Sequence, residues 1–249
     1  MRFIFSATMV LAAACLVLLL EHAVGTVNTS YVSLFTHHPS TQVEIINTHN
    51  DFRRMVKPSA KNMLKMTWNS EVARNAEIWA KKCRFSHSPV NQRKTALSGC
   101  GENYFWSTDP KPWPYVIKSF YDEVKDFQFG VGNTRKDAQI GHYTQLVWAS
   151  SHQLGCAMAP CPPHQTRRYF YVCHYCPMGN IDKKMNTPYQ LGRPCADCPG
   201  HCDNGLCTNP CKYVDRYSNC AELVKKMGCA AKITRKDCKA TCECPSEIK

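Results

Sequence analysis

Cysteines crowd one end of this chain: ten of the seventeen lie among the last 55 residues, from Cys195 onward. A segment this short buries little apolar surface, so disulfide bonds must supply the stability that a larger core would give. Each bridge contributes about 2–4 kcal/mol by restricting the unfolded chain. We therefore expect a small disulfide-rich domain here, with one helical stretch at Ala221–Met227. The spacing does not choose among the possible pairings of ten cysteines.

The first 25 residues predict the compartment in which these cysteines oxidise. Arg2 precedes an apolar run from Phe3 to Leu20, and the small residues Ala23-Val24-Gly25 follow. This pattern predicts a cleaved secretory signal peptide; a transmembrane anchor is the alternative, because the run is about long enough to span a bilayer. Cleavage removes Cys15 and leaves sixteen cysteines, which can all pair outside the cell, where zinc sites built from CxxC pairs are the weaker alternative. We expect a secreted, extracellular protein with no transmembrane segment after signal removal.

The chain carries a formal net charge of +12. A basic surface is usually just solvated, and in some proteins it contacts acidic glycans or membranes. No nucleic-acid-binding motif accompanies the charge, so we expect no nucleic-acid partner. Near the mature N-terminus, the sequon Asn28-Thr29-Ser30 predicts N-glycosylation at Asn28.

Residue periodicity predicts helices packed on a sheet in layers, an α+β arrangement. Three helices are expected. In the first, Thr41–Val56, helical spacing links Val43, Ile46, His49 or Asn50, and Phe52 or Arg53. The second is Ser70–Lys82, capped by Asn69, and the third opens at Pro114 and buries Ile117, Phe120, Tyr121 and Val124. Enrichment in β-branched and aromatic residues predicts strands at Tyr104–Trp106, Gly155–Met158 and Arg168–His174, and the alternation in Gln145–Trp148 predicts the start of another.

Residues 177–194 have the composition of a linker. They hold three prolines and several polar turn formers, and they contain no cysteine. The disulfide-rich segment begins directly after them, so the chain is expected to divide here.

Several of these stretches carry a family resemblance. The motif GHYTQLVW at 141–148, the motif YFYVCHYCPMGN at 169–180 and the ten-cysteine tail resemble the cysteine-rich secretory proteins, whose first domain belongs to the wider CAP superfamily. The closing CKATCEC…EIK is most similar to the epididymal mammalian members. The resemblance implies an α-β-α sandwich (the CAP domain) at 26–180, a linker at 181–194, a disulfide-knotted hinge at 195–210 and a small helical domain at 211–249 that is similar to channel-blocking toxins.

The resemblance also implies a disulfide pairing, obtained by matching cysteines in order. The sandwich would hold Cys83–Cys161, Cys100–Cys176 and Cys156–Cys173. The hinge would hold Cys195–Cys202 and Cys198–Cys207, and the tail Cys211–Cys244, Cys220–Cys238 and Cys229–Cys242.

Members of the family have a cavity lined by two histidines and two acids. Matched motif by motif, these are His87, His142, Glu102 and Glu123. Two neutral imidazoles with open coordination positions suit weakly bound zinc, and the carboxylates would orient them or hold a metal-bound water. Each histidine is otherwise an ordinary hydrogen-bonded residue, and Glu102 is otherwise a structural acceptor of backbone donors.

No enzyme is expected from these residues. The chain has no HExxH motif, no GxSxG motif and no spare cysteine, and a third zinc ligand is missing unless a carboxylate serves. The resemblance implies a secreted, non-enzymatic binding protein of the male reproductive tract that associates with the sperm surface and contributes to sperm maturation and sperm–egg binding. The alternatives are a metal-dependent peptidase and a lipid or sterol carrier acting through the CAP domain.

The expected partners are a cell-surface protein or an ion channel on sperm or egg, and peripheral contact with membrane or lipid is left open. The tail would modulate a channel by pressing cationic and aromatic side chains on its mouth. Candidates for this contact are Lys212, Tyr213, Lys225, Lys226, Arg235 and Lys236. An ordinary solvated surface is the alternative for each of them.

Overall fold

A computed structural model of the chain describes residues 29–162, 167–182 and 184–249. The predicted signal peptide, Cys15 and the predicted glycosylation site Asn28 lie outside these residues. A short 3-10 helix, η1 (Thr29–Leu34), begins the described chain, and residues 34–249 form one compact unit. Within the described ranges, no helix is long and apolar enough to cross a membrane.

A four-stranded mixed sheet organises residues 34–176, with strand order β1-β5-β6-β2. The central strands β5 (Gln153–Pro160) and β6 (Tyr169–Cys176) pair antiparallel. β1 (Thr67–Trp68) runs parallel to β5, and β2 (Gly101–Ser107) runs antiparallel to β6. The predicted strands at residues 104–106, 155–158 and 168–174 are therefore confirmed and somewhat longer than expected.

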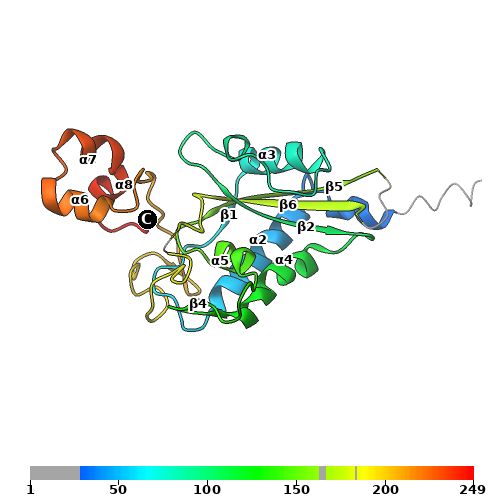
Figure 1. Ribbon diagram of the computed structural model, residues 1–249, viewed down its shortest axis with the longest axis horizontal. Coiled ribbons are helices and arrows are strands. Elements are labelled where there is room, and N and C mark those ends of the chain that lie inside the picture. Colours follow the sequence, from blue (N-terminus) through cyan, green and yellow to red (C-terminus); the bar gives the residue numbers. More distant parts are fainter. Residues whose placement is uncertain (1–28, 163–166, 183) are drawn as a thin grey trace, which may run out of the picture. The chain divides into compact units, whose positions relative to one another are not determined.

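Helices cover both faces of this sheet, which confirms the α+β, α-β-α class (Figure 1). α3 (Ser70–Ala80) lies on one face; α2 (Pro39–Arg54), α4 (Trp113–Tyr121) and α5 (Gly141–Leu146) lie on the other. The predicted cap of α3 is confirmed, since the Asn69 side chain accepts hydrogen bonds from the amides of Glu71 and Val72 at 2.9 and 3.1 Å.

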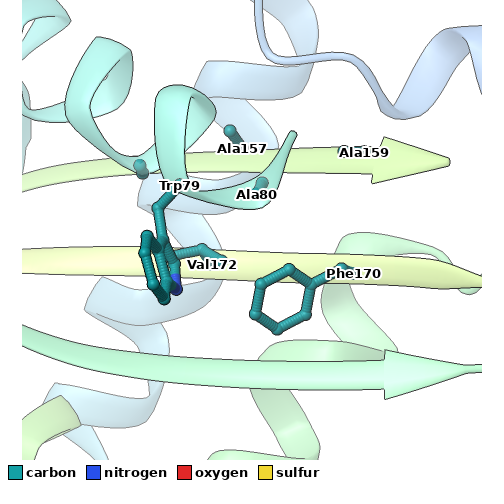
Figure 2. Close-up of a cluster of buried hydrophobic side chains, with 7 residues drawn as sticks. Trp79, Ala80, Ala157, Ala159, Phe170 and Val172 are labelled. Carbon is teal, nitrogen blue, oxygen red and sulfur yellow. The ribbon is translucent and has the colours of Figure 1, made fainter. Parts of the chain in front are cut away.

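Small and aromatic side chains fill the layer between α3 and the sheet (Figure 2). Trp79 and Ala80 of α3 meet Ala157 and Ala159 of β5 and two residues of β6, Phe170 and Val172. Gly155 permits this close approach, because a Cβ there would lie 2.1 Å from the backbone nitrogen of Ala73. The core therefore forms where helix and strand backbones come almost into contact.

The predicted strand at Gln145–Trp148 is wrong, because GHYTQL forms the helix α5. Tyr143, Thr144, Gln145 and Leu146 are all buried. Because four consecutive residues of this helix are buried and two of them are polar, its sequence shows no 3.6-residue period and can resemble a strand.

Helix α2 is confirmed, and its predicted spacing is right at His49, Asn50 and Arg53, which are buried, but wrong at Val43 and Ile46, which are not. Val43 is 57 % exposed, and the buried face carries Ile45 together with polar residues, among them His49 and Arg53. The Arg53 guanidinium donates to four main-chain carbonyls at 2.7–3.0 Å. Nε and Nη2 bond Leu64, Nη1 bonds Leu146 and Trp148, and Nη2 also bonds Ala149. Desolvation by burial lowers the pKa of Arg53 to about 9.

The third predicted helix is confirmed with different bounds. α4 starts at Trp113 and ends at Tyr121, after which η3 (Asp122–Asp126) continues as a 3-10 helix and holds Glu123. Another 3-10 turn, η2 (Val90–Gln92), lies between α3 and β2. After η3, β3 (Phe127–Gln128) pairs with β4 (Gly132–Asn133) as a small hairpin.

The C-terminal segment is built from short elements. β7 (Cys202–Asp203) and β8 (Leu206–Cys207) form a hairpin, followed by α6 (Cys220–Met227), α7 (Lys232–Asp237) and α8 (Lys239–Glu243). Only the first of these helices was expected from the sequence. The sixteen cysteines of the described residues form eight disulfides, paired as the resemblance implies.

The hinge packs on the sandwich rather than standing apart from it. The Cys207 amide donates a hydrogen bond to the Met63 carbonyl, and the Cys207 carbonyl accepts one from the Lys65 amide, both at 2.8 Å. Leu64 shares a small core with Cys195, Cys198, Cys207 and Ile248. The predicted linker, residues 177–194, is also hydrogen-bonded to the sandwich. The carbonyls of residues 188 and 190 accept hydrogen bonds from the amides of residues 149 and 61, respectively.

Candidate functional site: two histidine–carboxylate pairs

The first pair joins His87 to Glu102 of β2. His87 Nδ1 lies 2.7 Å from Glu102 Oε1. The Glu102 side chain is fully buried, whereas that of His87 is 56 % exposed. A buried carboxylate therefore holds a surface imidazole by one nitrogen and leaves the other, Nε2, toward solvent.

Three further residues hold Glu102, and sequence reasoning missed all of them. His174 Nε2 lies 2.9 Å from Oε2, Ser88 donates its amide and its hydroxyl at 2.9 and 2.6 Å, and Arg93 approaches at 3.3 Å. Burial alone would raise the pKa of Glu102, but hydrogen bonds from His174, His87 and Ser88 lower it well below its usual range. The carboxylate is thus ionised, and both its oxygens are occupied.

One sequence signal could have found His174. Its partner across the ladder is Glu102, because β2 and β6 pair in that register. The segments CGEN (residues 100–103) and YFYVCH (residues 169–174) therefore face each other as antiparallel strands, and side chains directly opposite in such a ladder lie in contact. Ser88 and Arg93 lie in a loop and give no comparable signal.

The second pair joins His142 of α5 to Glu123 of η3. His142 Nδ1 lies 2.7 Å from Glu123 Oε1, and the other oxygen accepts the amides of His142 and Tyr143 at 2.8 and 3.0 Å. The His142 ring also stacks on Phe120, with centroids 5.1 Å apart. Glu123 therefore holds both the start of α5 and the imidazole that α5 carries.

Tyr104 of β2 lies against both imidazoles. Its ring is edge-on to His87 at 4.8 Å and to His142 at 6.3 Å between centroids. The four predicted residues are thus brought to one edge of the sheet, with a tyrosine that the sequence analysis did not single out. The two histidines have the same hydrogen-bonding arrangement, since each bonds a carboxylate oxygen through Nδ1.

The donor set suits a weak site for a borderline metal ion. A carboxylate oxygen that accepts from Nδ1–H fixes the tautomer with an unprotonated Nε2, which is the form that binds zinc. Within the described residues, however, neither histidine belongs to a group of three side chains with ligand atoms within 4.8 Å of one another. The single such group, Cys195, Cys198 and Cys207, is consumed by disulfides. Water would have to complete the coordination.

A buried network supports the His142 pair from behind. His49 Nδ1 lies 2.8 Å from the Ile45 carbonyl, so this nitrogen is the donor, and Nε2 accepts from Tyr175 Oη at 2.9 Å. Asn103 Nδ2 donates to Tyr175 Oη and to the His142 carbonyl, at 3.3 and 3.0 Å. These hydrogen bonds connect α2 with α5 by way of two sheet residues, Tyr175 of β6 and Asn103 of β2.

The predicted cationic residues of the tail lie on its surface. Lys212 is 5.1 Å from the ring of Tyr213, and Lys239, which was not predicted, is 5.9 Å from the same ring. Lys225 and Lys226 end α6, and Arg235 and Lys236 end α7; all four are exposed. Tyr213 packs on the core formed by Cys211, Ala240 and Cys244.

A cavity of about 180 Å³ lies elsewhere, beside α3 and β5. Its lining mixes polar and charged side chains, including His37, Arg74 and Glu77, with a few apolar ones. A lipid chain needs an apolar enclosure, so this cavity does not favour lipid carriage.

Comparisons with known proteins agree with this architecture. The family model "Cysteine-rich secretory protein family" (CAP) matches residues 46–175, and the model "Crisp" matches residues 195–249. The chain is 48 % identical over 235 residues to "Cysteine-rich venom protein helothermine" of Heloderma horridum horridum, covering 94 % of this chain and 97 % of that one. It is 49 % identical over 219 residues to "Cysteine-rich secretory protein 2" of Homo sapiens, covering 88 % and 90 %.

A solved structure extends the comparison to three dimensions. "Crystal structure of NaASP2 with Zn2+" aligns with a TM-score of 0.58 and 32 % identity, over 69 % of this chain and 96 % of that one. The near-equal identities to a lizard venom protein and a human protein do not separate the mammalian members from the reptilian ones.

Proposed function

Since the chain belongs to the cysteine-rich secretory protein family, we propose that it is a secreted binding protein with two active surfaces. The sandwich binds a cell-surface partner and holds zinc weakly at His87 and His142. The tail modulates an ion channel. The partner cell is sperm, where the protein contributes to maturation and to binding between sperm and egg.

The zinc proposal rests on the matched pair of imidazoles. Both bond a carboxylate through Nδ1, at 2.7 Å in each case, and so present Nε2 for coordination. The solved structure at 32 % identity is one with Zn2+, which supports the same metal for this chain. When bound, zinc would be held by His87, in the loop before β2, and by His142 of α5. The carboxylates would keep the two imidazole rings oriented.

Hydrolysis is not part of the proposal. Glu102 accepts from His87, His174, Ser88 and Arg93, and Glu123 accepts from three donors, so neither carboxylate is available as a general base. The Ser88 hydroxyl donates to Glu102 at 2.6 Å and is held as a structural group.

Calorimetry with zinc chloride tests the metal on the full-length oxidised protein. We expect a binding heat that His142→Ala abolishes and that Glu123→Gln weakens about 10- to 100-fold, as for other carboxylates behind a metal-bound histidine. His201→Ala, an exposed hinge histidine, is the control and should bind as the parent does. Equal heats for the parent and His142→Ala would remove zinc from the proposal.

The channel proposal rests on the cation–aromatic cluster Lys212–Tyr213–Lys239. A disulfide, Cys211–Cys244, anchors the tyrosine, and two ammonium groups lie within 6 Å of its ring. Such a cluster is fixed before binding, so little conformational entropy is lost on contact with an acidic channel mouth.

Whole-cell recording tests this with the intact protein, on sperm and on channel-expressing cells. Tyr213→Ala and Lys212→Gln should each reduce the effect on cation current, whereas Lys81→Gln, an exposed α3 cation, should not. Full activity in both tail variants would assign the effect to another surface. An effect on channel-expressing cells without one on sperm would overturn the sperm assignment alone.

A further inference from the structure

The sheet ends at β2, whose ladder uses only one of its two sides (Figure 1). The phase of that ladder follows from the Cys156–Cys173 bridge, which joins directly opposite residues with Cα atoms 4.1 Å apart. So short a separation marks a non-hydrogen-bonded pair. Cys173 therefore turns its peptide groups away from β5 and toward Asn103 of β2.

Alternation along the strand fixes the remaining groups. If Asn103 and Phe105 bond to β6, then Tyr104 and Trp106 direct their N–H and C=O groups outward. The carbonyl of Leu154 confirms the phase from the far edge, since it accepts the Asn69 amide at 2.8 Å and so points away from β6. No described residue hydrogen-bonds the backbone of Tyr104 or Trp106 outside the ladder, and Trp106 is 38 % exposed.

Aromatic and cationic side chains line both sides of this edge. On the α3 face, Arg167 lies 4.8 Å from the ring of Trp106. On the opposite face, Lys111 lies 5.4 Å from the ring of Tyr115, which itself contacts Phe105. An added strand would project alternate side chains to these two faces in turn.

Charge at this end of β2 is predominantly positive. Arg168 is exposed beside Arg167 and donates its amide to Ser107 at 2.9 Å. The acid at the same end, Asp109, is paired with Lys111 at 2.7 Å. Three cations against one acid favour an acidic partner.

We propose that the outer edge of β2 at Tyr104–Trp106 binds an extended acidic segment of a partner protein by strand addition. Up to four backbone hydrogen bonds join the two chains, and Arg167 and Lys111 contact carboxylates on alternate sides of the added strand. The proposal rests on the binding role of the sandwich given above and names the kind of partner.

Amide hydrogen exchange on the full-length protein is the first test, with a decapeptide of alternating glutamate and valine as the probe. In the free protein, the amides of Tyr104 and Trp106 should exchange faster than that of Phe105. Saturating peptide should slow exchange at Tyr104 and Trp106 by about tenfold or more and leave Phe105 unchanged. Binding of the peptide without such protection would overturn strand addition, and equal binding of a lysine–valine peptide would overturn the acidic preference.

A matched pair of variants separates the backbone from the side chain. Trp106→Ala and Trp106→Pro both remove the indole, but only the proline variant also removes the outward N–H. An edge strand tolerates a proline whose missing N–H would face outward. Fluorescence anisotropy should show about tenfold weaker peptide binding for Trp106→Pro than for Trp106→Ala, as for one lost hydrogen bond. Equal peptide affinities of the two variants would overturn the proposal. A concentration-dependent dimer that Trp106→Pro dissociates would also overturn it, since the edge would then bind a second copy of the chain. Cell binding retained while the peptide fails would leave the proposed function intact.

Discussion

Arg53 shows how a buried guanidinium can hold a fold together through main-chain carbonyls. All its donors meet main-chain carbonyls from three separate segments, at residues 64, 146 and 148–149. We expect Arg53→Met to lower the free energy of unfolding by about 3–5 kcal/mol, because it removes the side-chain donors of four main-chain carbonyls, of which Trp148 and Ala149 each keep a backbone donor. The neighbouring Arg54, which bonds one carbonyl at the surface, is the control. Urea denaturation should show a loss of about 1 kcal/mol or less for Arg54→Met, and similar losses for both variants would contradict the argument.

His49 gives the free energy of unfolding a pH dependence. Desolvation by burial lowers its pKa from 6.5 to about 4; the Ile45 carbonyl opposes this and the Arg53 charge adds to it. The unfolded chain takes up the proton first, so stability is unaffected above pH 6.5 and falls as the pH drops toward 4, by about 3 kcal/mol in all.

The His49→Gln variant isolates this contribution. It should be less stable at pH 7 but lose most of the slope of unfolding free energy between pH 6.5 and 4.5. His152, whose pKa is also lowered chiefly by burial, accounts for a residual slope. Denaturant titrations at several pH values measure both, and a variant with the parental slope would assign the dependence to another group.

At the scale of elements, Gly155 tests how closely α3 and β5 must pack. A methyl group there would lie 2.1 Å from Ala73 N and 2.6 Å from its Cα, and these are backbone atoms that cannot move aside alone. We expect Gly155→Ala to reduce the free energy of unfolding by about 3 kcal/mol, the upper end of the usual range for overpacking. Gly200→Ala is the control, because no atom lies within 4 Å of its added carbon. Thermal unfolding that shifts equally in both would contradict this account.

Elements with an amphipathic or capped sequence were predicted well, and elements that bury polar groups were predicted less well. Asn69 and the stripe through Ala76 and Ala80 determined α3, because apolar residues alone face its sheet. The inner face of α2 carries His49 and Arg53, whose hydrogen bonds come from residues far along the chain. The helical spacing included both residues as alternatives, but hydrophobic periodicity cannot detect their partners, so it began the face at Val43 and missed Ile45.

The candidate site shows the same division. His87, His142, Glu102 and Glu123 came from a resemblance, and the structure places each acid on its histidine. Their spacing in sequence, 15 and 19 residues, gave no physical reason to pair them. A register between CGEN and YFYVCH would have added His174, but strand pairing depends on tertiary packing that a single sequence does not state.

At the scale of the whole molecule, the hinge couples the tail to the sandwich. Leu64 of the sandwich packs against Cys198 and Cys207 of the hinge and against Ile248, and Ile248 exchanges backbone hydrogen bonds with residues 209 and 211. Separating the chain near residue 190 would therefore expose a shared core. Tests of the tail are better made by substitution within the intact protein.

Leu64→Ala should loosen this junction without unfolding the sandwich sheet. Among the described cysteines, every disulfide lies within 83–176, 195–207 or 211–244, so none crosses residues 177–194 or 208–210. A single cut in either gap releases the tail on a non-reducing gel. The lost methyl groups should lower local stability by about 2–5 kcal/mol, enough to raise the release rate by tenfold or more when opening precedes cleavage.

The matched control is Leu97→Ala, which removes the same atoms from a leucine that is 63 % exposed in the sandwich. Limited trypsin digestion should release its tail at the parental rate. Amide exchange at Lys65 and Cys207, whose bonds join the two parts, should accelerate only in Leu64→Ala. If both variants release the tail equally, the hinge is not held by this core, and the tail moves independently of the sandwich.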